Sequence, residues 1–147
     1  MDPDEPQYGA ADVATFLGEK ERRIRDLHDR GFAGFFGRRD GYRVLYSVRD
    51  IAGASVARDL VQLGFAPRLA ARVGAVTCYR DPHPEAVLTG SPAQIAAITP
   101  APGSGFVHDR QTYNMPPHIP STISIPVGRI WADIVEKAGR LRRARSH

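Results

Sequence analysis

Cysteine is nearly absent from the sequence, which has only Cys78 among its 147 residues. A single cysteine excludes an intramolecular disulfide and any metal site built from several cysteines. No apolar run approaches the roughly 18 residues that a membrane-spanning helix needs. The first seven residues, MDPDEPQ, are acidic and contain two prolines, the opposite of a secretory or transit peptide. We therefore expect a cytoplasmic protein with no membrane partner and with a flexible acidic N-terminus at residues 1–7.

Proline is scarce in the first half of the chain, where residues 8–73 contain only Pro67. Residues 82–126 contain nine prolines, and regular structure must be short there because proline lacks an amide donor and clashes inside helices. This change in composition predicts two domains, at residues 8–74 and 75–147.

The signatures of a catalytic or metal site are also missing. His83, His108 and His118, taken with Cys78 or Asp109, match no spacing typical of metal ligands. Residues 103–105, GSG, lack the strand and the lysine that a phosphate-binding loop requires. No base is predicted beside Cys78 to activate it as a nucleophile. We predict a protein that is not an enzyme and that has no metal or cofactor.

Basic residues are the feature that the chain has in excess. The net charge is +4, with acidic residues concentrated in residues 1–7 and a basic excess in the rest. Residues 8–74 contain twelve Lys/Arg, eleven of them arginine, against eight Asp/Glu. The planar guanidinium group suits phosphate oxygens and guanine edges. This composition favours a polyanionic partner, although many basic proteins are merely soluble.

The first domain reads as a series of short elements. AADVATFLG at residues 10–18 and KERRIRDLHDRG at residues 20–31 each have apolar residues at helical spacing and end on glycine, which predicts a helix-turn-helix unit. In residues 32–47, aromatic and β-branched residues flank Asp40-Gly41, a strong signal for a two-residue hairpin turn. Ser47 and Asp50 resemble a capping box that begins a helix over residues 48–63, and Pro67 opens another to about residue 73.

In this order and at these spacings, residues 8–73 resemble the DNA-binding domain of the MerR family of bacterial transcription regulators. The matching pieces are Y…VA..LG at residues 8–18, IR at 24–25, GYR at 41–43 and LGF at 63–65. The resemblance implies a winged helix-turn-helix, a mainly α fold with a small β wing. It implies that the second helix enters the major groove of double-stranded DNA while the wing lies along the backbone.

The resemblance also implies which side chains contact DNA. For the second helix the periodicity agrees, because Arg22, Arg23 and Arg25 lie off the stripe formed by Ile24 and Leu27. We expect the second helix to read base edges and the wing to hold the backbone. The expected DNA-binding residues are Arg22, Arg23, Arg25, Arg38, Arg39, Tyr42 and Arg43. The chain departs from the family at Asp26, where an aromatic residue is usual. A carboxylate there would repel phosphate or accept a hydrogen bond from a cytosine amino group.

The second domain lacks the long dimerisation helix that the family has directly after LGF. Ser91 and Pro92 predict a short helix, a strand is possible near Phe106, and residues 121–126, STISIP, predict a short strand. Residues 127–145 have an apolar stripe at helical spacing. The stripe predicts either a homodimer, through antiparallel pairing of two copies, or packing against the Pro-rich region. Its proposed dimerisation residues are Ile130, Trp131, Ile134, Val135 and Leu141.

The sequence therefore predicts a sequence-specific transcriptional regulator that binds promoter DNA as a homodimer on a two-fold site. Activation by distortion of promoter DNA, as in the family, would make RNA polymerase a further partner. Two alternatives remain open. One is a DNA-bending, excisionase-like recombination accessory protein, and the other is an adaptor whose basic surface meets an acidic protein. Arg140, Arg142, Arg143 and Arg145 form a basic tail, for which there are two interpretations, a favourable interaction with the helix dipole or a contact with DNA.

Overall fold

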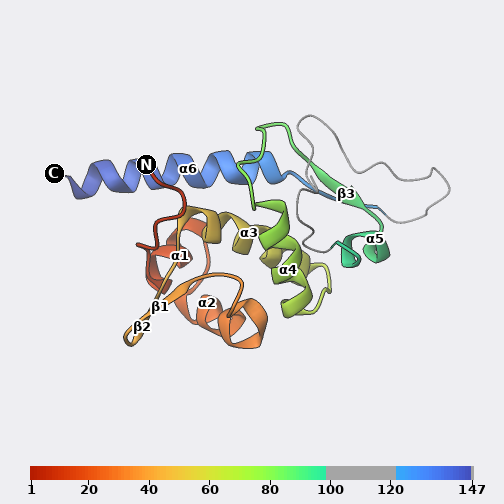
Figure 1. Ribbon diagram of the computed structural model, residues 1–147, viewed down its shortest axis with the longest axis horizontal. Coiled ribbons are helices and arrows are strands. Elements are labelled where there is room, and N and C mark those ends of the chain that lie inside the picture. Colours follow the sequence, from red (N-terminus) through yellow and green to blue (C-terminus); the bar gives the residue numbers. More distant parts are fainter. Residues whose placement is uncertain (99–121, 147) are drawn as a thin grey trace.

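The computed structural model describes residues 1–98 and 122–146, and it is mainly helical with two small antiparallel sheets (Figure 1). The strand expected near Phe106, the GSG segment, His108, Asp109 and His118 lie outside the described residues. In the described part, no helix combines the length and apolarity that crossing a membrane requires. The elements are α1 (Ala10–Leu17), α2 (Glu21–Leu27), the π-helical turn η1 (His28–Phe32), β1 (Arg38–Asp40), β2 (Arg43–Leu45), α3 (Val48–Gln62), α4 (Pro67–Thr77), β3 (Leu88–Gly90), α5 (Pro92–Ala96), β4 (Ile123–Ile125) and α6 (Val127–Arg145).

The helix starts and stops largely follow the sequence signals. Gly18 ends α1 in the left-handed conformation, with φ of 64°. The Ser47 hydroxyl accepts from the Asp50 amide and the Asp50 carboxylate accepts from the Ser47 amide, so the predicted capping box begins α3. The helix expected over residues 20–30 is different in shape. Regular α-helix ends at Leu27, and η1 carries the chain past Gly31 to Phe32.

The predicted hairpin is present, but its turn lies one residue later than expected. Asp40 pairs with Arg43, so Gly41 and Tyr42 form the turn instead of Asp40 and Gly41. Gly41 has φ of 61°, the left-handed value that both common two-residue hairpin turns require at this position. Asp40 therefore stays in the ladder and Tyr42 moves to the tip.

A second sheet joins segments that are far apart in the chain. β3 pairs with the predicted strand β4, with Leu88 opposite Ile125 and Gly90 opposite Ile123. The sequence did not predict β3, because a three-residue strand carries almost no periodicity. Ser91 and Gln94 complete a capping box at the start of α5, as the motif predicted for Ser91.

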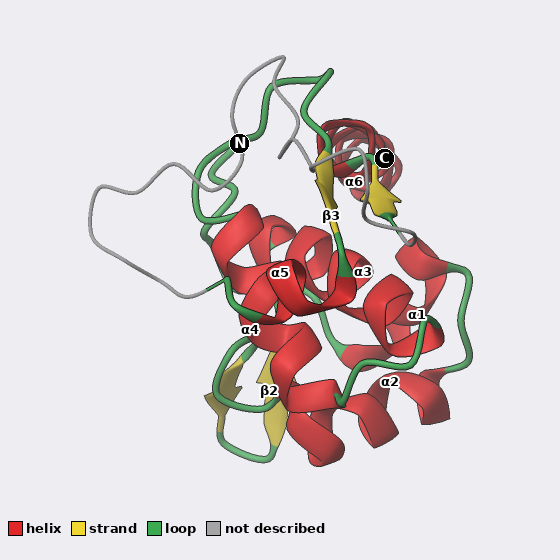
Figure 2. Cartoon of the chain, turned by 90° about the vertical axis from the view of Figure 1, so that its right-hand side faces the viewer, coloured by secondary structure: helices red, strands yellow, loops and turns green. Residues whose placement is uncertain are grey.

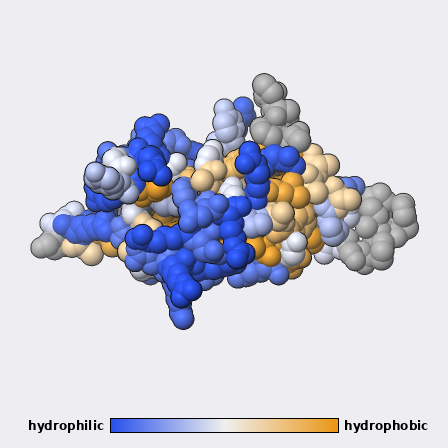
Figure 3. Space-filling view, turned by 90° about the horizontal axis from the view of Figure 1, so that it is seen from below, coloured by the Kyte–Doolittle hydropathy of each residue, from blue (hydrophilic) through white to orange (hydrophobic). Residues whose placement is uncertain are grey.

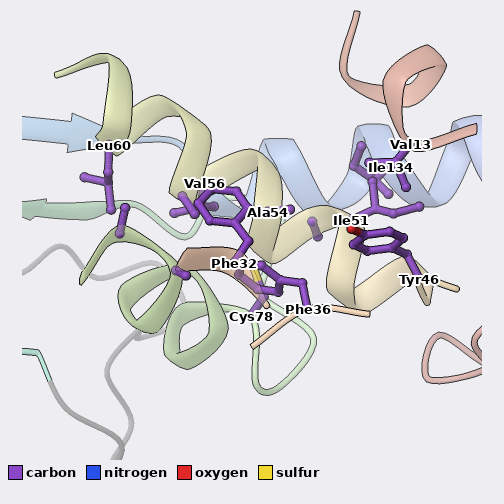
Figure 4. Close-up of a cluster of buried hydrophobic side chains, with 14 of the residues drawn as sticks. Val13, Phe32, Phe36, Tyr46, Ile51, Ala54, Val56, Leu60, Cys78 and Ile134 are labelled. Atoms are coloured by element: carbon purple, nitrogen blue, oxygen red, sulfur yellow. The ribbon is translucent and has the colours of Figure 1, made fainter. Parts of the chain in front are cut away.

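The core surrounds α3, nine residues of which are buried (Figure 4). α4 crosses α3 closely at two glycines, since a Cβ built on Gly74 would lie 2.2 Å from the Gly53 carbonyl oxygen. Gly53 leaves room for the Phe36 ring, which packs edge to face on Phe32. These contacts hold α2, η1 and the hairpin to α3 through one apolar cluster.

α6 packs mainly on α3 of the same chain. Its first turn also packs on residues 83–86, where the Gly128 amide donates to the Ala86 carbonyl oxygen at 3.0 Å, so the expected packing on the Pro-rich region is present in part. Val127, Trp131, Ile134 and Ala138 are buried, while the remaining proposed dimerisation residues, Ile130, Val135 and Leu141, are partly buried against the same core. Lys137 Nζ donates to the Phe16 carbonyl oxygen at 3.0 Å, which fixes α6 to the end of α1. The apolar stripe of α6 is thus covered within one chain by the apolar faces of α1 and α3. The sequence pattern did not predict that α1 and α3 would be its partners.

The expected boundary at residue 74 falls inside α4, which continues to Thr77. Residues of both expected domains also belong to one hydrophobic core.

The N-terminal segment, expected to be flexible, is bound at Arg49. The Arg49 amide donates to the Pro3 carbonyl oxygen at 2.9 Å and its Nε donates to Asp4 at 2.7 Å.

Arg49 joins further segments with the rest of its guanidinium group. It donates to the Cys78 carbonyl oxygen and to Asp81, and it lies 5.0 Å from the centroid of the Trp131 ring. One arginine therefore links the N-terminus, α3, the chain after α4, and α6.

Candidate nucleic-acid interface

The second helix of the pair presents arginines to solvent on the side away from the core. Ile24 and Leu27 are buried, while Arg22 and Arg25 are exposed and Arg23 is half-buried. This is the distribution that the spacing predicted, because residues off the apolar stripe point outward. α1 packs against α2, and only Glu19 separates the C-cap of α1, Gly18, from the N-cap of α2, Lys20.

The arginines of α2 differ in their carboxylate partners. Arg23 pairs with Asp26 at 3.1 Å, and Arg25 pairs with Glu21 at 2.5 Å. Arg22 has no carboxylate partner among residues 1–98 and 122–146. The pairs lie at the surface, with 36% of the Arg23 side chain and 69% of the Arg25 side chain exposed. The guanidinium groups are thus tethered at the helix surface and are not turned into the core.

Sequence reasoning missed Arg30, which also contacts Asp26, with Nε 3.2 Å from its second carboxylate oxygen. The i,i+3 and i,i+4 spacing of residues 23, 26 and 30 was a usable signal. Each oxygen of Asp26 therefore lies against one arginine. A carboxylate oxygen can accept more than one hydrogen bond, so these contacts leave acceptor capacity for the expected cytosine amino group.

The hairpin carries the second set of predicted residues. Arg38, Arg39 and Arg43 are exposed, and Tyr42 at the tip is fully exposed. None of the three arginines has a carboxylate within ion-pair distance in the part of the chain that the structure describes. Arg38 pairs with Leu45 and Arg39 with Val44, so the two arginines lie on opposite faces of the two-stranded ribbon.

Tyr46 connects the hairpin to α2. Its hydroxyl lies 3.2 Å from His28 Nδ1, and its backbone exchanges two hydrogen bonds with Tyr8, just before α1. Burial raises the pKa of Tyr46 to about 12, so its hydroxyl keeps its proton at neutral pH. This residue thereby joins the start of α1, the end of α2 and the base of the hairpin.

α2 and the hairpin lie on the same side of the molecule, opposite α6 (Figures 1 and 2). Viewed from that side, the surface over α2 and the hairpin is hydrophilic, whereas apolar residues gather toward α4 and α5 (Figure 3). From Lys20 to Arg43 the chain has eight Lys/Arg against four Asp/Glu. α2 and the hairpin, which both carry exposed arginines, therefore lie on the same hydrophilic side of the molecule, in a segment with an excess of basic residues.

The basic tail of α6 lies apart from this surface. Arg145 pairs with Asp12 at 3.0 Å and lies over the Tyr8 ring, and Arg140 pairs with Glu136. Arg142 and Arg143 have no carboxylate partner among the described residues. The tail is thus held against the start of α1.

The described residues bear on two other kinds of chemistry, that of a metal site and that of a reactive thiol. They contain no group of three His, Cys, Asp or Glu side chains that could hold a metal ion. Cys78 is buried, and burial raises the pKa of its thiol to about 12, which keeps it in the unreactive thiol form.

Comparisons of the chain with family models, with curated proteins and with solved structures find no match.

Proposed function

We propose that the protein is a sequence-specific DNA-binding transcriptional regulator of the winged helix-turn-helix type. In this proposal α2 enters the major groove and the β1–β2 hairpin is the wing that follows the sugar-phosphate backbone. The observation that carries it is that α2 and the hairpin, which both carry exposed arginines, lie on the same side of the molecule. The order of elements and the resemblance of residues 8–73 to the MerR family support it.

The two parts of the surface have different roles in the proposal. Arg22, Arg23 and Arg25 read base edges, for which the bidentate guanidinium group suits guanine. Arg38, Arg39 and Arg43 neutralise phosphates and supply affinity that does not depend on sequence. Tyr42 packs on the backbone beside them.

The test is binding of the full chain to two labelled duplexes at several salt concentrations. One is a duplex that the chain selects from a random library, and the other is the same duplex scrambled. Replacing Arg38, Arg39 and Arg43 together by Gln should lower affinity for both duplexes. The dependence of log Kobs on log salt should become shallower by about 2.7, which corresponds to three lost phosphate contacts.

Arg129→Gln is the control, because Arg129 is exposed and belongs to α6, which lies on the other side of the molecule from α2 and the hairpin. An unchanged salt slope in the triple variant would exclude the hairpin from the interface. Failure of native protein to select any duplex from the library, together with no binding of random DNA at low or at moderate salt, would favour the adaptor for an acidic protein.

A homodimer on a two-fold promoter site remains part of the proposal, with one restriction. Trp131 and Ile134 lie in the core of a single chain, so two copies would associate through another surface or would have to release α6. The second candidate is an excisionase-like DNA-bending protein, which would use the same α2 and hairpin. Footprinting separates the two, since regulation places the site in a promoter and recombination places it at an attachment site.

A further inference from the structure

Asp26 occupies a bridging position on the proposed DNA-binding surface. Its Oδ2 lies 3.1 Å from Arg23 Nη1, one turn before it, and its Oδ1 lies 3.2 Å from Arg30 Nε, one turn after it. The Asp26 side chain is 40% exposed, so the three charged groups form a surface network and not a buried one.

The neighbouring acidic residues are placed differently. Glu21 contacts only Arg25, while Asp29 is exposed and has no ion-pair partner among the described residues. Asp26 is thus the acidic residue of this segment that fixes two arginines at once.

We propose that Asp26 is a positioning residue that sets the specificity of DNA recognition by orienting Arg23 and Arg30. This inference rests on the proposed function and names a determinant that the sequence resemblance does not supply, since Asp26 is where the chain departs from the family.

A guanidinium group has five N–H donors, and one contact to Asp26 leaves the others available to a base edge or a phosphate. An arginine side chain that is already ordered loses less conformational freedom on binding, and a group held in its productive geometry discriminates more sharply. The same carboxylate repels the phosphates of any duplex, which lowers binding to DNA of unrelated sequence.

Removing the charge of Asp26 should therefore raise the affinity for DNA in general and lower the preference for the selected sequence. Asp26→Asn should strengthen binding to the scrambled duplex, because one negative charge leaves the surface. It should weaken discrimination, because Arg23 and Arg30 lose their common anchor. We expect the ratio of affinities for the selected and the scrambled duplex to fall by about tenfold, within the range that one bidentate base contact contributes.

Asp29→Asn is the matched control, because it removes the same charge from the same segment without breaking an ion pair in the described structure. It should strengthen binding to both duplexes equally and leave their ratio at the native value. Thermal unfolding of both variants should match native protein, which excludes a change in folding as the cause.

The experiment measures both affinities by fluorescence anisotropy for native protein, Asp26→Asn and Asp29→Asn. An affinity ratio that is the same in the two variants would overturn the role of Asp26 while leaving the DNA-binding proposal intact. Failure of native protein to select any duplex would instead refute the proposed function, and the role of Asp26 with it.

Discussion

At the scale of single residues, the arginines of α2 are not equivalent, because Arg22 is free of the carboxylates that tether Arg23 and Arg25. Arg22→Ala should cost about 1–3 kcal/mol of binding free energy for a selected duplex if the residue reads a base. Its free energy of unfolding should change by less than about 0.5 kcal/mol, as is usual at an exposed position. Equal affinity of Arg22→Ala and native protein for that duplex would remove Arg22 from the readout.

Cys78 provides a prediction about pH. Burial raises the pKa of its thiol from 9.0 to about 12, so an unfolded chain releases the proton at lower pH than the folded one. The contribution of Cys78 to stability is therefore fully present below about pH 9 and is lost between pH 9 and 12. Denaturant titrations across this range should show a steeper decline for native protein than for Cys78→Ala. If the free energies of unfolding of native protein and Cys78→Ala declined in parallel with pH, the raised pKa of the Cys78 thiol would be contradicted.

The sequence predicted which arginines face solvent, because Ile24 and Leu27 define the buried side of the helix. It did not predict the partners of those arginines. Glu21, Asp26 and Asp29 all lie within reach of some arginine on a helix, and only the positions of the side chains show that Asp26 holds two of them.

At the scale of elements, α3 and α4 cross in close backbone contact at Gly53 and Gly74. A methyl group on Gly74 would meet the Gly53 carbonyl group, which belongs to the backbone and cannot move aside easily. Gly74→Ala should therefore lower the free energy of unfolding by about 1–3 kcal/mol, as overpacking of a core does. Chemical denaturation followed by circular dichroism measures this change in the free energy of unfolding.

Gly139→Ala on α6 is the control for the higher helix propensity of alanine. Its nearest neighbour is the flexible end of Arg143 at 3.5 Å, so it should gain about 0.5–1 kcal/mol of stability. A stabilised Gly74→Ala variant would mean that the two helices do not cross as closely as described.

Helices and the first hairpin were predictable because their signals are local. The glycine after α1, the capping boxes at Ser47 and Ser91, and the apolar periodicity of α6 all lie within a few residues. β3 pairs with a strand more than thirty residues away, and no local pattern specifies such a pairing. The stripe on α6 indicated a buried face, but a stripe does not identify what covers it.

At the scale of the whole molecule, α6 and the proposed DNA-binding elements share one hydrophobic core. Ile134 is 2% exposed, and Ile134→Ala should destabilise the protein by about 2–5 kcal/mol. The loss should affect the whole chain in one transition, so Trp131 fluorescence and far-ultraviolet circular dichroism should report the same midpoint. Separate midpoints would show that α6 unfolds independently of α3.

The most direct measurement of the central claim maps where DNA contacts the protein. Isotope-labelled full-length chain would be titrated with a selected duplex while backbone amide resonances are followed. Shifts should concentrate in residues 20–32 and 38–45, the segments of α2, η1 and the hairpin. Shifts concentrated instead in the basic end of α6, or distributed without regard to these segments, would contradict the assignment of α2 and the hairpin as the DNA-binding surface.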